Sequence, residues 1–307
     1  MVLAMTLHPR MEQVVLVSDF QLGGENQILQ FKESVSGRGI RIGKAVQELG
    51  EKVECMGFCS AGARHALYEE LIQAGIASDF IETAGAQRMR LTIFDQKGNS
   101  KTSCVQQGAA VDSAAVEQLE VAYARNLAKM GEGDVVTLGG SVPAGVREEI
   151  YASLISMAKE RKIRAVLAAR GECLLQGLAA GPYAAIISLL DLEAAAKEKL
   201  SGKKQICRAA RAALRSAKAR YFCVAMEERV FLIWEEEALC APLKKGCCCV
   251  WDGMAAGLTY AVQCGAEPRK LLQGVAAGGE LLCKKVPVAQ RELEMRMREI
   301  PVEKVEA

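Results

Sequence analysis

Short apolar runs alternate with stretches of helical periodicity along most of this chain, and no other feature of the sequence restricts the fold as strongly. Several runs are apolar at every position, which is typical of parallel strands buried on both faces. Strands separated by helices favour an α/β fold, in which helices cover both faces of a mostly parallel sheet. The predicted strands are residues 14–17, 52–58, 90–95, 134–140, 164–169, 184–188, 220–226 and 230–234.

Three of the predicted helices carry recognisable end signals. The helix over residues 112–131 starts at Asp112, a residue type that caps helix N-termini, and stops near Gly131. The stretch 143–162 ends in basic residues, which suit the negative end of a helix dipole. The stretch 267–285 opens with Pro268 near its first turn, where proline is well tolerated.

The first hundred or so residues differ from the rest of the chain. Strand-like pieces there are polar at alternate positions and are joined by glycine-rich turns such as QLGGEN. We expect a single domain over residues 1–307, with a small β lid built from pieces of roughly residues 10–35 and 80–106. Such a lid can cover a ligand, or it can pair two subunits into a homodimer.

Composition excludes several classes of partner. The 307 residues carry a formal net charge of +2, which gives no strong field for nucleic acid or an anionic membrane. No window approaches the ~18 apolar residues of a membrane span. The first residues, MVLAMTLHPRMEQ, lack the charged and apolar regions of a signal peptide, so a cytoplasmic location is expected.

Twelve cysteines raise the alternative of a zinc site. The chain contains no C-x-x-C pair and only two histidines, whereas structural zinc usually takes paired thiolates or imidazoles. Cys247, Cys248 and Cys249 are adjacent, so in an extended segment they would alternate faces and not grip one ion together. We predict reduced thiols packed as small apolar side chains and no structural metal.

Four segments, in order, carry a resemblance to a known family. They are TLHP at 6–9, SGRGIRIGKAVQELG at 36–50, GDVVTLGGSVPAGV at 133–146 and WDGMAAGL at 251–258. Together they resemble the PfkB/ribokinase-like carbohydrate kinases, in particular the branch of 1-phosphofructokinase and tagatose-6-phosphate kinase. The resemblance implies a doubly wound ribokinase-like fold with a β lid, and phosphoryl transfer from ATP, with Mg²⁺, to a sugar phosphate.

Asp252 falls where the family has its catalytic base, at the start of a helix. On the bare sequence, an aspartate that opens a helix is more often a cap than a base. The family precedes this aspartate with Gly-Ala-Gly, whereas this chain has Cys249, Val250 and Trp251, and Gly253 follows. Glycine lets the backbone approach a phosphate closely, and the larger side chains here would crowd that approach.

The positions on the nucleotide and Mg²⁺ side depart from the family pattern as well. Its Asn-x-x-Glu motif reads Ser188 to Asp191 here, so the acid is kept one methylene shorter and the amide is lost. Its Ser-x-Gly-x-x-Gly loop runs from Ala225 to Val230 and includes Glu227, a carboxylate near the expected path of the ATP phosphates. Negative charge there would repel ATP; otherwise the loop is a solvated turn between two strands.

The resemblance assigns a second group of residues to the sugar-phosphate pocket. Arginine matches the geometry of phosphate, although surface arginines are equally common. His8 stands where the family has an asparagine, and Glu12 stands where an aspartate grips sugar hydroxyls. The substrate-binding candidates are Glu12, Gly37, Arg38, Gly39, Arg41, Arg88, Arg90, Gly140 and Ser141.

Two ligand-binding functions remain open at this point, and a structural dimer that binds no ligand is a third alternative. The first is an ATP-dependent sugar-phosphate kinase with weakened activity, in which Asp252 is the base. The second is a non-catalytic pseudokinase that binds a sugar phosphate or another anion in a regulatory role. The altered ATP-side motifs favour the second function, and the resemblance favours the first.

Overall fold

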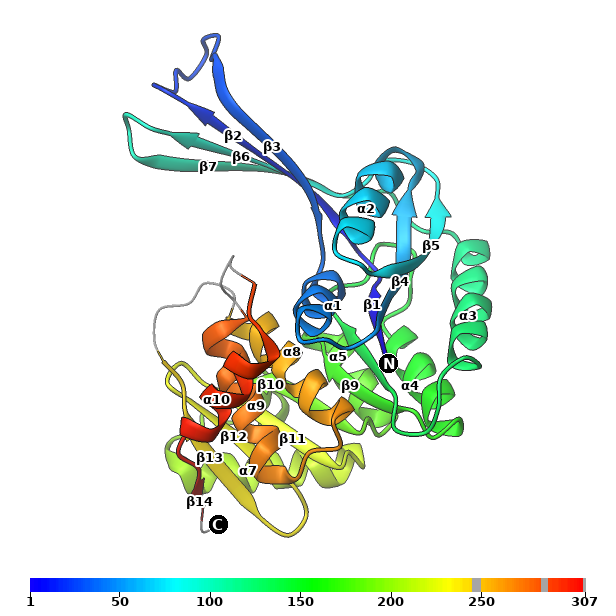
Figure 1. Ribbon diagram of the computed structural model, residues 1–307, viewed down its shortest axis with the longest axis vertical. Helices are drawn as coiled ribbons and strands as arrows, with labels where there is room; N and C mark the ends of the chain where they lie inside the picture. Colours follow the sequence, from blue (N-terminus) through cyan, green and yellow to red (C-terminus); the bar gives the residue numbers. More distant parts are fainter. Residues whose placement is uncertain (245–249, 283–286, 306–307) are drawn as a thin grey trace.

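The computed structural model of the protein describes residues 1–244, 250–282 and 287–305. Within these ranges it contains an extended main sheet covered by helices and a smaller sheet that projects away from it (Figure 1). No helix in these ranges is both long and apolar enough to cross a membrane.

In the described part of the chain, ten strands form the main sheet. The first seven strands in the sheet order given below run parallel, and the last three are antiparallel additions at one edge. The order is β5 (Ala77–Thr83), β4 (Val53–Ser60), β1 (Val2–Thr6), β8 (Val135–Gly139), β9 (Arg164–Ala168), β10 (Ala184–Ser188), β11 (Tyr221–Ala225), β12 (Arg229–Ile233), β13 (Ala238–Pro242) and β14 (Glu303–Lys304).

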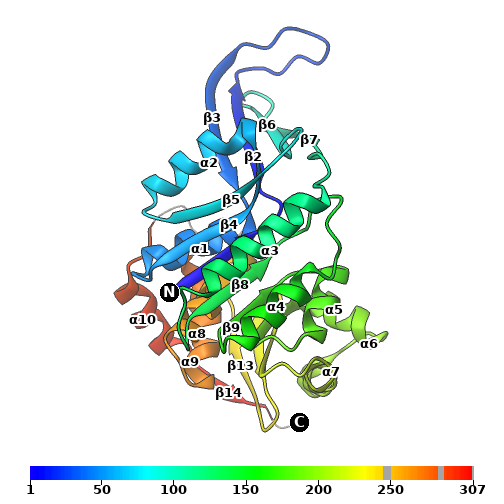
Figure 2. The same ribbon diagram turned by 90° about the vertical axis from the view of Figure 1, so that its right-hand side faces the viewer.

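Helices cover both faces of this sheet (Figure 2) and pack against it in two apolar cores. One core is built by α1 (Arg38–Glu48), α2 (Ala61–Gln73), α8 (Val250–Gln263), α9 (Pro268–Leu281) and α10 (Gln290–Glu299). The other is built by α3 (Ser113–Leu127), α4 (Ile150–Glu160), α5 (Gly171–Ala179), α6 (Leu189–Ala196) and α7 (Gly202–Ala217). Strands between two helical layers must be apolar on both sides, which explains their continuous apolar runs.

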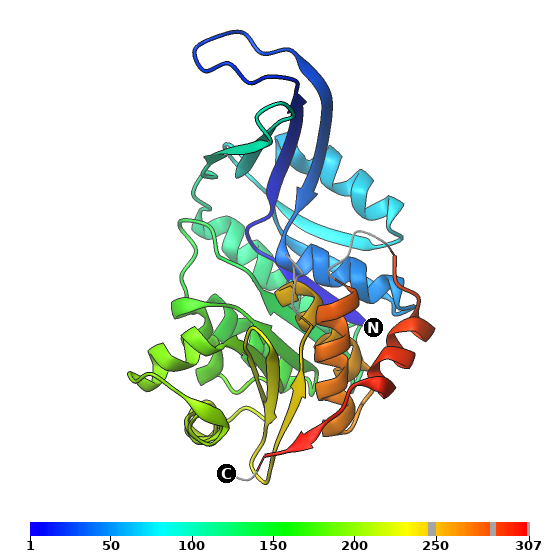
Figure 3. The ribbon, with the colours of Figure 1, turned by 90° about the vertical axis from the view of Figure 1, so that its left-hand side faces the viewer.

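The second sheet, called the lid below, consists of β3 (Ile28–Ser36), β2 (Arg10–Val17), β6 (Met89–Asp95) and β7 (Ser100–Gln106), in that order. It extends beyond the main body as a twisted ribbon (Figure 3). Its strands are polar at many positions, and β7 is exposed along its whole length. Lid strands β2 and β6 follow the carboxyl ends of main-sheet strands β1 and β5 after short connections.

The strand order reverses direction between β1 and β8. From β1 the chain builds outward through β4 and β5, and from β8 it builds in the opposite direction through β9, β10 and β11. Open α/β sheets bind ligands at such a reversal, beyond the carboxyl ends of the strands. The fold therefore directs attention to the residues that follow Thr6 and Gly139.

The predicted fold class is confirmed, and several element predictions need correction. Asp112 caps α3 by accepting a hydrogen bond from the Ala115 amide at 2.8 Å, and Pro268 begins α9, as predicted. Helix α4 begins at Ile150 and not at 143, because the preceding residues form turns. The sequence analysis missed β1, a central strand, together with β3, β5, β7, β13 and β14.

Candidate functional site

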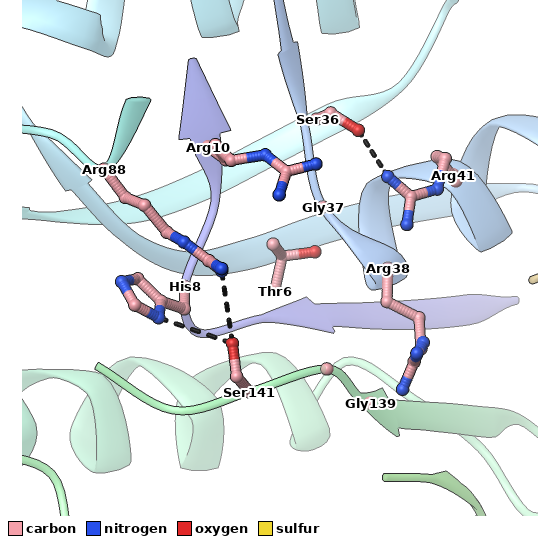
Figure 4. Close-up of a pocket in the computed structure, with 11 residues that line it drawn as sticks. Thr6, His8, Arg10, Ser36, Gly37, Arg38, Arg41, Arg88, Gly139 and Ser141 are labelled. Atoms are coloured by element: carbon pink, nitrogen blue, oxygen red, sulfur yellow. Dashed lines mark hydrogen bonds between the residues drawn. The ribbon is translucent and has the colours of Figure 1, made fainter. Parts of the chain in front are cut away.

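A polar pocket of about 140 Å³ lies at the reversal point of the main sheet, underneath the base of the lid (Figure 4). Its walls come from the ends of β1 and β8, from the start of α1 and from the base of the lid, where β2 begins, β3 ends and Arg88 precedes β6. It is lined by Thr6, His8, Arg10, Ser36, Gly37, Arg38, Arg41, Arg88, Gly139, Gly140 and Ser141.

Two glycines allow α1 to start in close contact with the end of β1. A Cβ atom added to Gly37 would lie 2.2 Å from the Thr6 methyl group, and one added to Gly39 would lie 2.1 Å from the Met5 carbonyl oxygen. Thr6 also accepts a hydrogen bond from the Ile40 amide at 2.8 Å, which satisfies a donor in the first turn of α1. The positive end of the α1 dipole is thereby fixed at the pocket. Gly37 lines the pocket, whereas Gly39 is buried in this packing contact.

Among the described residues, four arginines line the pocket: Arg10, Arg38, Arg41 and Arg88. Arg90 is not among the lining residues, because it lies further along the lid, in register with Glu12 of the neighbouring strand. Arg10 was missed by the sequence analysis. Its signal was available, since residues two apart on a strand share a face and Glu12 had been noted.

Glu12 itself is engaged by Arg10. The Arg10 Nε donates to Glu12 Oε1 at 2.7 Å, and the second guanidinium contact is a close ion pair with the same oxygen. Glu12 is not among the lining residues of the pocket. The carboxylate therefore orients an arginine of the pocket, and it does not present its oxygens to a ligand in this arrangement.

Asp252 lies in the first turn of α8 with both carboxylate oxygens held by arginines of α1. Arg38 Nε lies 3.1 Å from Oδ1, and Arg41 Nε lies 2.6 Å from Oδ2. The Asp252 side chain is only 13% exposed, so these charge-assisted contacts are largely shielded from water. Arg38 additionally donates to the Ala168 carbonyl at 2.7 Å, and Arg41 donates to the Ser36 hydroxyl.

Gly139 gives Arg38 room to reach this position. A Cβ atom at residue 139 would lie 3.0 Å from Cδ of Arg38 and 2.9 Å from the Ala168 carbonyl oxygen. Gly140 follows with φ +97°, a left-handed conformation that glycine adopts without strain. The glycine pair after β8 thus serves both the turn and the path of an arginine side chain.

Trp251, directly before Asp252, makes a cation–π contact with Arg170. The guanidinium carbon of Arg170 lies 4.9 Å from the ring centre, and the ring packs against the core on the α8 side of the sheet. The backbone of Gly253 packs against α9, where a Cβ atom added to Gly278 would lie 2.3 Å from the Gly253 carbonyl oxygen. A bulky residue, Trp251, therefore precedes Asp252, and a small one, Gly253, follows it.

His8 and Arg88 meet at the end of the pocket opposite Arg38. Ser141 Oγ lies 3.4 Å from His8 Nδ1 and 3.4 Å from Arg88 Nη1. Burial, and then the Arg88 charge, lower the pKa of His8 to about 4, so the imidazole is neutral at pH 7. Burial and the neighbouring Arg10 and Arg90 lower the pKa of Arg88.

Four of the nucleotide-side candidates, Ser188, Asp191, Ala225 and Glu227, lie at or just beyond the carboxyl ends of β10 and β11 and do not line this pocket. Ser188 and Asp191 form a capping box at α6, in which the Asp191 amide donates to the Ser188 hydroxyl oxygen at 3.1 Å. Ala225 pairs with Ser188 in the sheet and precedes a tight turn closed by a 2.8 Å hydrogen bond from the Met226 amide to the Arg229 carbonyl. Glu227 is exposed in this turn.

The cysteines that the structure describes are unpaired thiols, and most of them are buried. Burial raises the pKa of Cys55 and of Cys223 to about 12, so neither thiol forms a thiolate at neutral pH. No three histidine, cysteine or acidic side chains converge as metal ligands within the described ranges. The cluster Cys247–Cys249 lies outside the described residues, and the prediction made for it stays a prediction.

Comparison with known proteins was made by family model, by sequence and by fold. The model of the pfkB family carbohydrate kinases matches residues 11–222. A tagatose-6-phosphate kinase of Staphylococcus epidermidis is 25% identical over 57% of this chain and 54% of its own length. A 1-phosphofructokinase of Bacillus subtilis is 24% identical over 60% of this chain and 58% of its own length. The matched segment thus spans little more than half of these curated relatives.

The fold is similar over a longer range than the sequence. The crystal structure of phosphofructokinase-2 from Escherichia coli in complex with fructose-6-phosphate superposes with a TM-score of 0.83, at 20% identity, over 97% of this chain and 98% of that one. The matched family model covers more than half of the chain and includes α1, β8 and all of the lid except Arg10, whereas β1 lies before it. This chain belongs to the pfkB family of carbohydrate kinases.

Proposed function

We propose that the protein is a sugar-phosphate kinase of weakened activity, which transfers a phosphoryl group from ATP to a phosphorylated ketohexose such as fructose 1-phosphate or tagatose 6-phosphate. The observation that carries this proposal is the position of Asp252, at the first turn of α8 and in direct contact with two arginines that line the polar pocket. Family membership gives the reaction class, and the arginines of the pocket supply positive charge that can bind the phosphate group of a sugar phosphate.

The reaction requires a base at this position. A hydroxyl oxygen of the sugar forms a bond to the γ-phosphorus of ATP, the bond from that phosphorus to the bridging oxygen breaks, and ADP leaves. The hydroxyl proton passes to the Asp252 carboxylate. The α8 N-terminus and the guanidinium groups next to it stabilise the negative charge on the transferred group.

Two features support a slow rate. Both oxygens of Asp252 already accept hydrogen bonds from arginines, so a sugar hydroxyl must share this carboxylate with two guanidinium groups. Trp251, with Arg170 against its ring, occupies the position of a glycine in the family motif. Losing the alignment of one donor at a developing oxyanion typically costs ~10²–10³ in rate, and the losses need not add.

ATP and Mg²⁺ are proposed cofactors. Mg²⁺ takes most of its ligands from phosphate oxygens and water and needs only one or two protein carboxylates. Asp191 is the described carboxylate in a suitable place, although its Oδ2 accepts from the Ser188 hydroxyl within the capping box. When bound, the metal would neutralise charge on the transferred phosphate.

A second function is favoured by the same contacts. Asp252 is held by two guanidinium groups, and Asp191 takes part in a helix cap. Both acids therefore have structural roles. These observations favour a pseudokinase that binds a sugar phosphate or another anion without turnover. In this role Asp252 would serve to position Arg38 and Arg41.

A coupled ADP-release assay separates the two functions. Wild-type protein and Asp252→Asn are assayed with Mg-ATP and fructose 1-phosphate, fructose 6-phosphate or tagatose 6-phosphate, and binding of each ligand is measured by calorimetry. Slow turnover that Asp252→Asn abolishes supports the kinase. Sugar-phosphate binding with equal background rates in both proteins supports the pseudokinase, and the absence of both turnover and binding contradicts both functions.

We further propose that the chain folds as one domain and forms a homodimer through the lid. The lid presents large apolar side chains to solvent, including Phe31, which is 58% exposed, and Ile28, which is 53% exposed. Exposed apolar clusters on an extended sheet are typical of interaction surfaces. Phe31 and Ile28 pair with Val15 and Val17, on the face opposite to Arg10.

A further inference from the structure

The charges around the pocket do not balance. Among the described residues, four lining arginines meet two carboxylates: Glu12 holds Arg10, and Asp252 is shared by Arg38 and Arg41. Four positive charges against two negative ones leave an excess of two, before the helix dipole of α1 is added. His8 adds no charge at neutral pH. The pocket therefore has an excess of about two positive charges, which attracts an anionic ligand.

The excess is divided between two ends of the pocket. Figure 4 shows Arg88 beside His8 and Ser141 at one end, and Arg38 and Arg41 at the other, with Thr6 between them. At the first end, Arg88 lies 3.4 Å from the Ser141 hydroxyl. The positive charges of Arg10 and Arg90 nearby repel that of Arg88. At the second end, two guanidinium groups share a single carboxylate.

The second end favours an anionic group over a neutral sugar hydroxyl. A hydroxyl donates one hydrogen bond and is best bound where an acceptor such as a carboxylate is available. Guanidinium groups have no acceptor, and the Asp252 oxygens already accept from Arg38 and Arg41. A carboxylate or phosphate group of a ligand, which only accepts, fits this end better.

From this distribution we propose that the pocket binds an organic anion with two separate acidic groups, of the class of phosphorylated sugar acids. The phosphate lies at the Arg88, Arg10 and Ser141 end, and the carboxylate lies against Arg38 and Arg41. The phosphate end rests on the proposed function, and the carboxylate end goes beyond it. Arg41 is the more accessible of the two arginines at that end, with 40% of its side chain exposed.

A matched pair of ligands tests the second acidic group. The molecules 6-phosphogluconate and glucitol 6-phosphate differ only at C1, which is a carboxylate in the first and a hydroxymethyl group in the second. Calorimetric titration of the full chain at pH 7 is expected to show at least about tenfold tighter binding of 6-phosphogluconate, because a charge-assisted contact exceeds a neutral one by that order. Equal affinities would overturn the proposal.

Variants of Arg41 test whether this residue binds the second acidic group. Arg41→Gln is expected to reduce the affinity ratio of the two ligands to near one, and Arg41→Lys to restore part of it. Arg64→Gln is the matched control, since Arg64 pairs with Glu82 at an exposed site on α2. An unchanged ratio in Arg41→Gln, in protein that melts near the wild-type temperature, would also overturn the proposal.

The two proposals fail in different ways. If ketohexose phosphates bind and the affinity ratio is near one, the second acidic group is wrong and the sugar-phosphate pocket stands. If 6-phosphogluconate binds and ketohexose phosphates do not, the second acidic group stands and the ketohexose substrate is wrong. If none of these ligands binds, both proposals are wrong.

Discussion

Arg38 and Asp252 are 214 positions apart in the sequence, yet Nε of the one lies 3.1 Å from Oδ1 of the other. The contact joins the first turn of α1 to the first turn of α8, and Arg41 reinforces it from the next turn of α1. The candidate base is thus part of an ion cluster at the junction of two helices. Its contacts with Arg38 and Arg41 and its proposed role as a base involve the same two oxygens.

Replacing Asp252 by asparagine should reveal both roles. The variant leaves the guanidinium groups of Arg38, which is 17% exposed, and of the more exposed Arg41 with one neutral acceptor, so we expect the free energy of unfolding to fall by about 2 kcal/mol. ADP release should fall to background, and the affinity for fructose 1-phosphate should rise because the pocket gains net positive charge. Urea unfolding, the coupled assay and calorimetry measure the three effects. Asp19→Asn is the control for stability, since it removes only an exposed ion pair with Lys97.

Gly39 should tolerate no side chain. In Gly39→Ala the new Cβ would meet the Met5 carbonyl oxygen at 2.1 Å, and this oxygen belongs to a central strand that has little freedom to move. We expect a loss of about 3 kcal/mol or more in the free energy of unfolding. Gly62→Ala is the matched helical control, because nothing lies within 4 Å of its Cβ position; it should stabilise by ~0.5–1 kcal/mol. Similar urea midpoints for the two variants would contradict this packing.

His8 should make stability depend on pH. Its pKa is about 4 in the folded protein and 6.5 as the unperturbed value. Between these values the unfolded chain takes up a proton that the folded chain does not, so stability rises with pH. The contribution is fully present above pH 6.5 and is lost as the pH falls toward 4. Urea unfolding at a series of pH values should therefore show a steeper loss for the wild type than for His8→Asn; parallel curves would show that His8 is not held neutral.

Trp251→Gly should raise the rate of any phosphoryl transfer. The substitution removes the ring under Arg170 and frees the backbone before Asp252 for a closer approach of phosphate. It also removes packing, and a loss of about 3 kcal/mol in stability is expected. Trp234→Gly is the control, because Trp234 packs against Tyr221 in the main sheet. A rise in the rate of ADP release confined to Trp251→Gly supports the crowding argument, and a fall in both variants would contradict it.

The lid dimer has a direct test in solution. The double variant Ile28→Lys/Phe31→Lys places charge on the apolar lid face and should convert a dimer to a monomer, measured by light scattering after gel filtration. Phe94→Lys is the control, because Phe94 pairs with Leu16 and therefore lies on the opposite face of the same sheet. A wild type that is already monomeric would contradict the proposal.

The fold was predictable from the sequence where the strands are apolar throughout and flanked by helix signals. The lid strand β7 is polar and fully exposed, so no apolar pattern marked it. The strand β1 is apolar but only five residues long, and it lies at the start of the chain, where no preceding helix signals a strand. In both cases tertiary context, and not local preference, makes the strand.

The site was predictable as a set of residues and not as a set of contacts. The motif positions identified Arg38, Arg41, Arg88 and Asp252. The sequence contained no signal that two of these arginines would hold the aspartate, because the contact depends on how α1 and α8 meet after folding. The pairing of Arg10 with Glu12 is local and depends on the two-residue period of a strand, so it could have been predicted from the sequence.

One residue, Gly37, separates the last residue of lid strand β3 from the first residue of α1. Ser36 on the lid side accepts a hydrogen bond from Arg41 on the helix side. The lid and the arginines next to Asp252 are therefore mechanically coupled through one short joint, and not through a flexible linker. A force that bends the lid, whether from a ligand beneath it or a second subunit against it, acts on the same turn of helix that holds the candidate base.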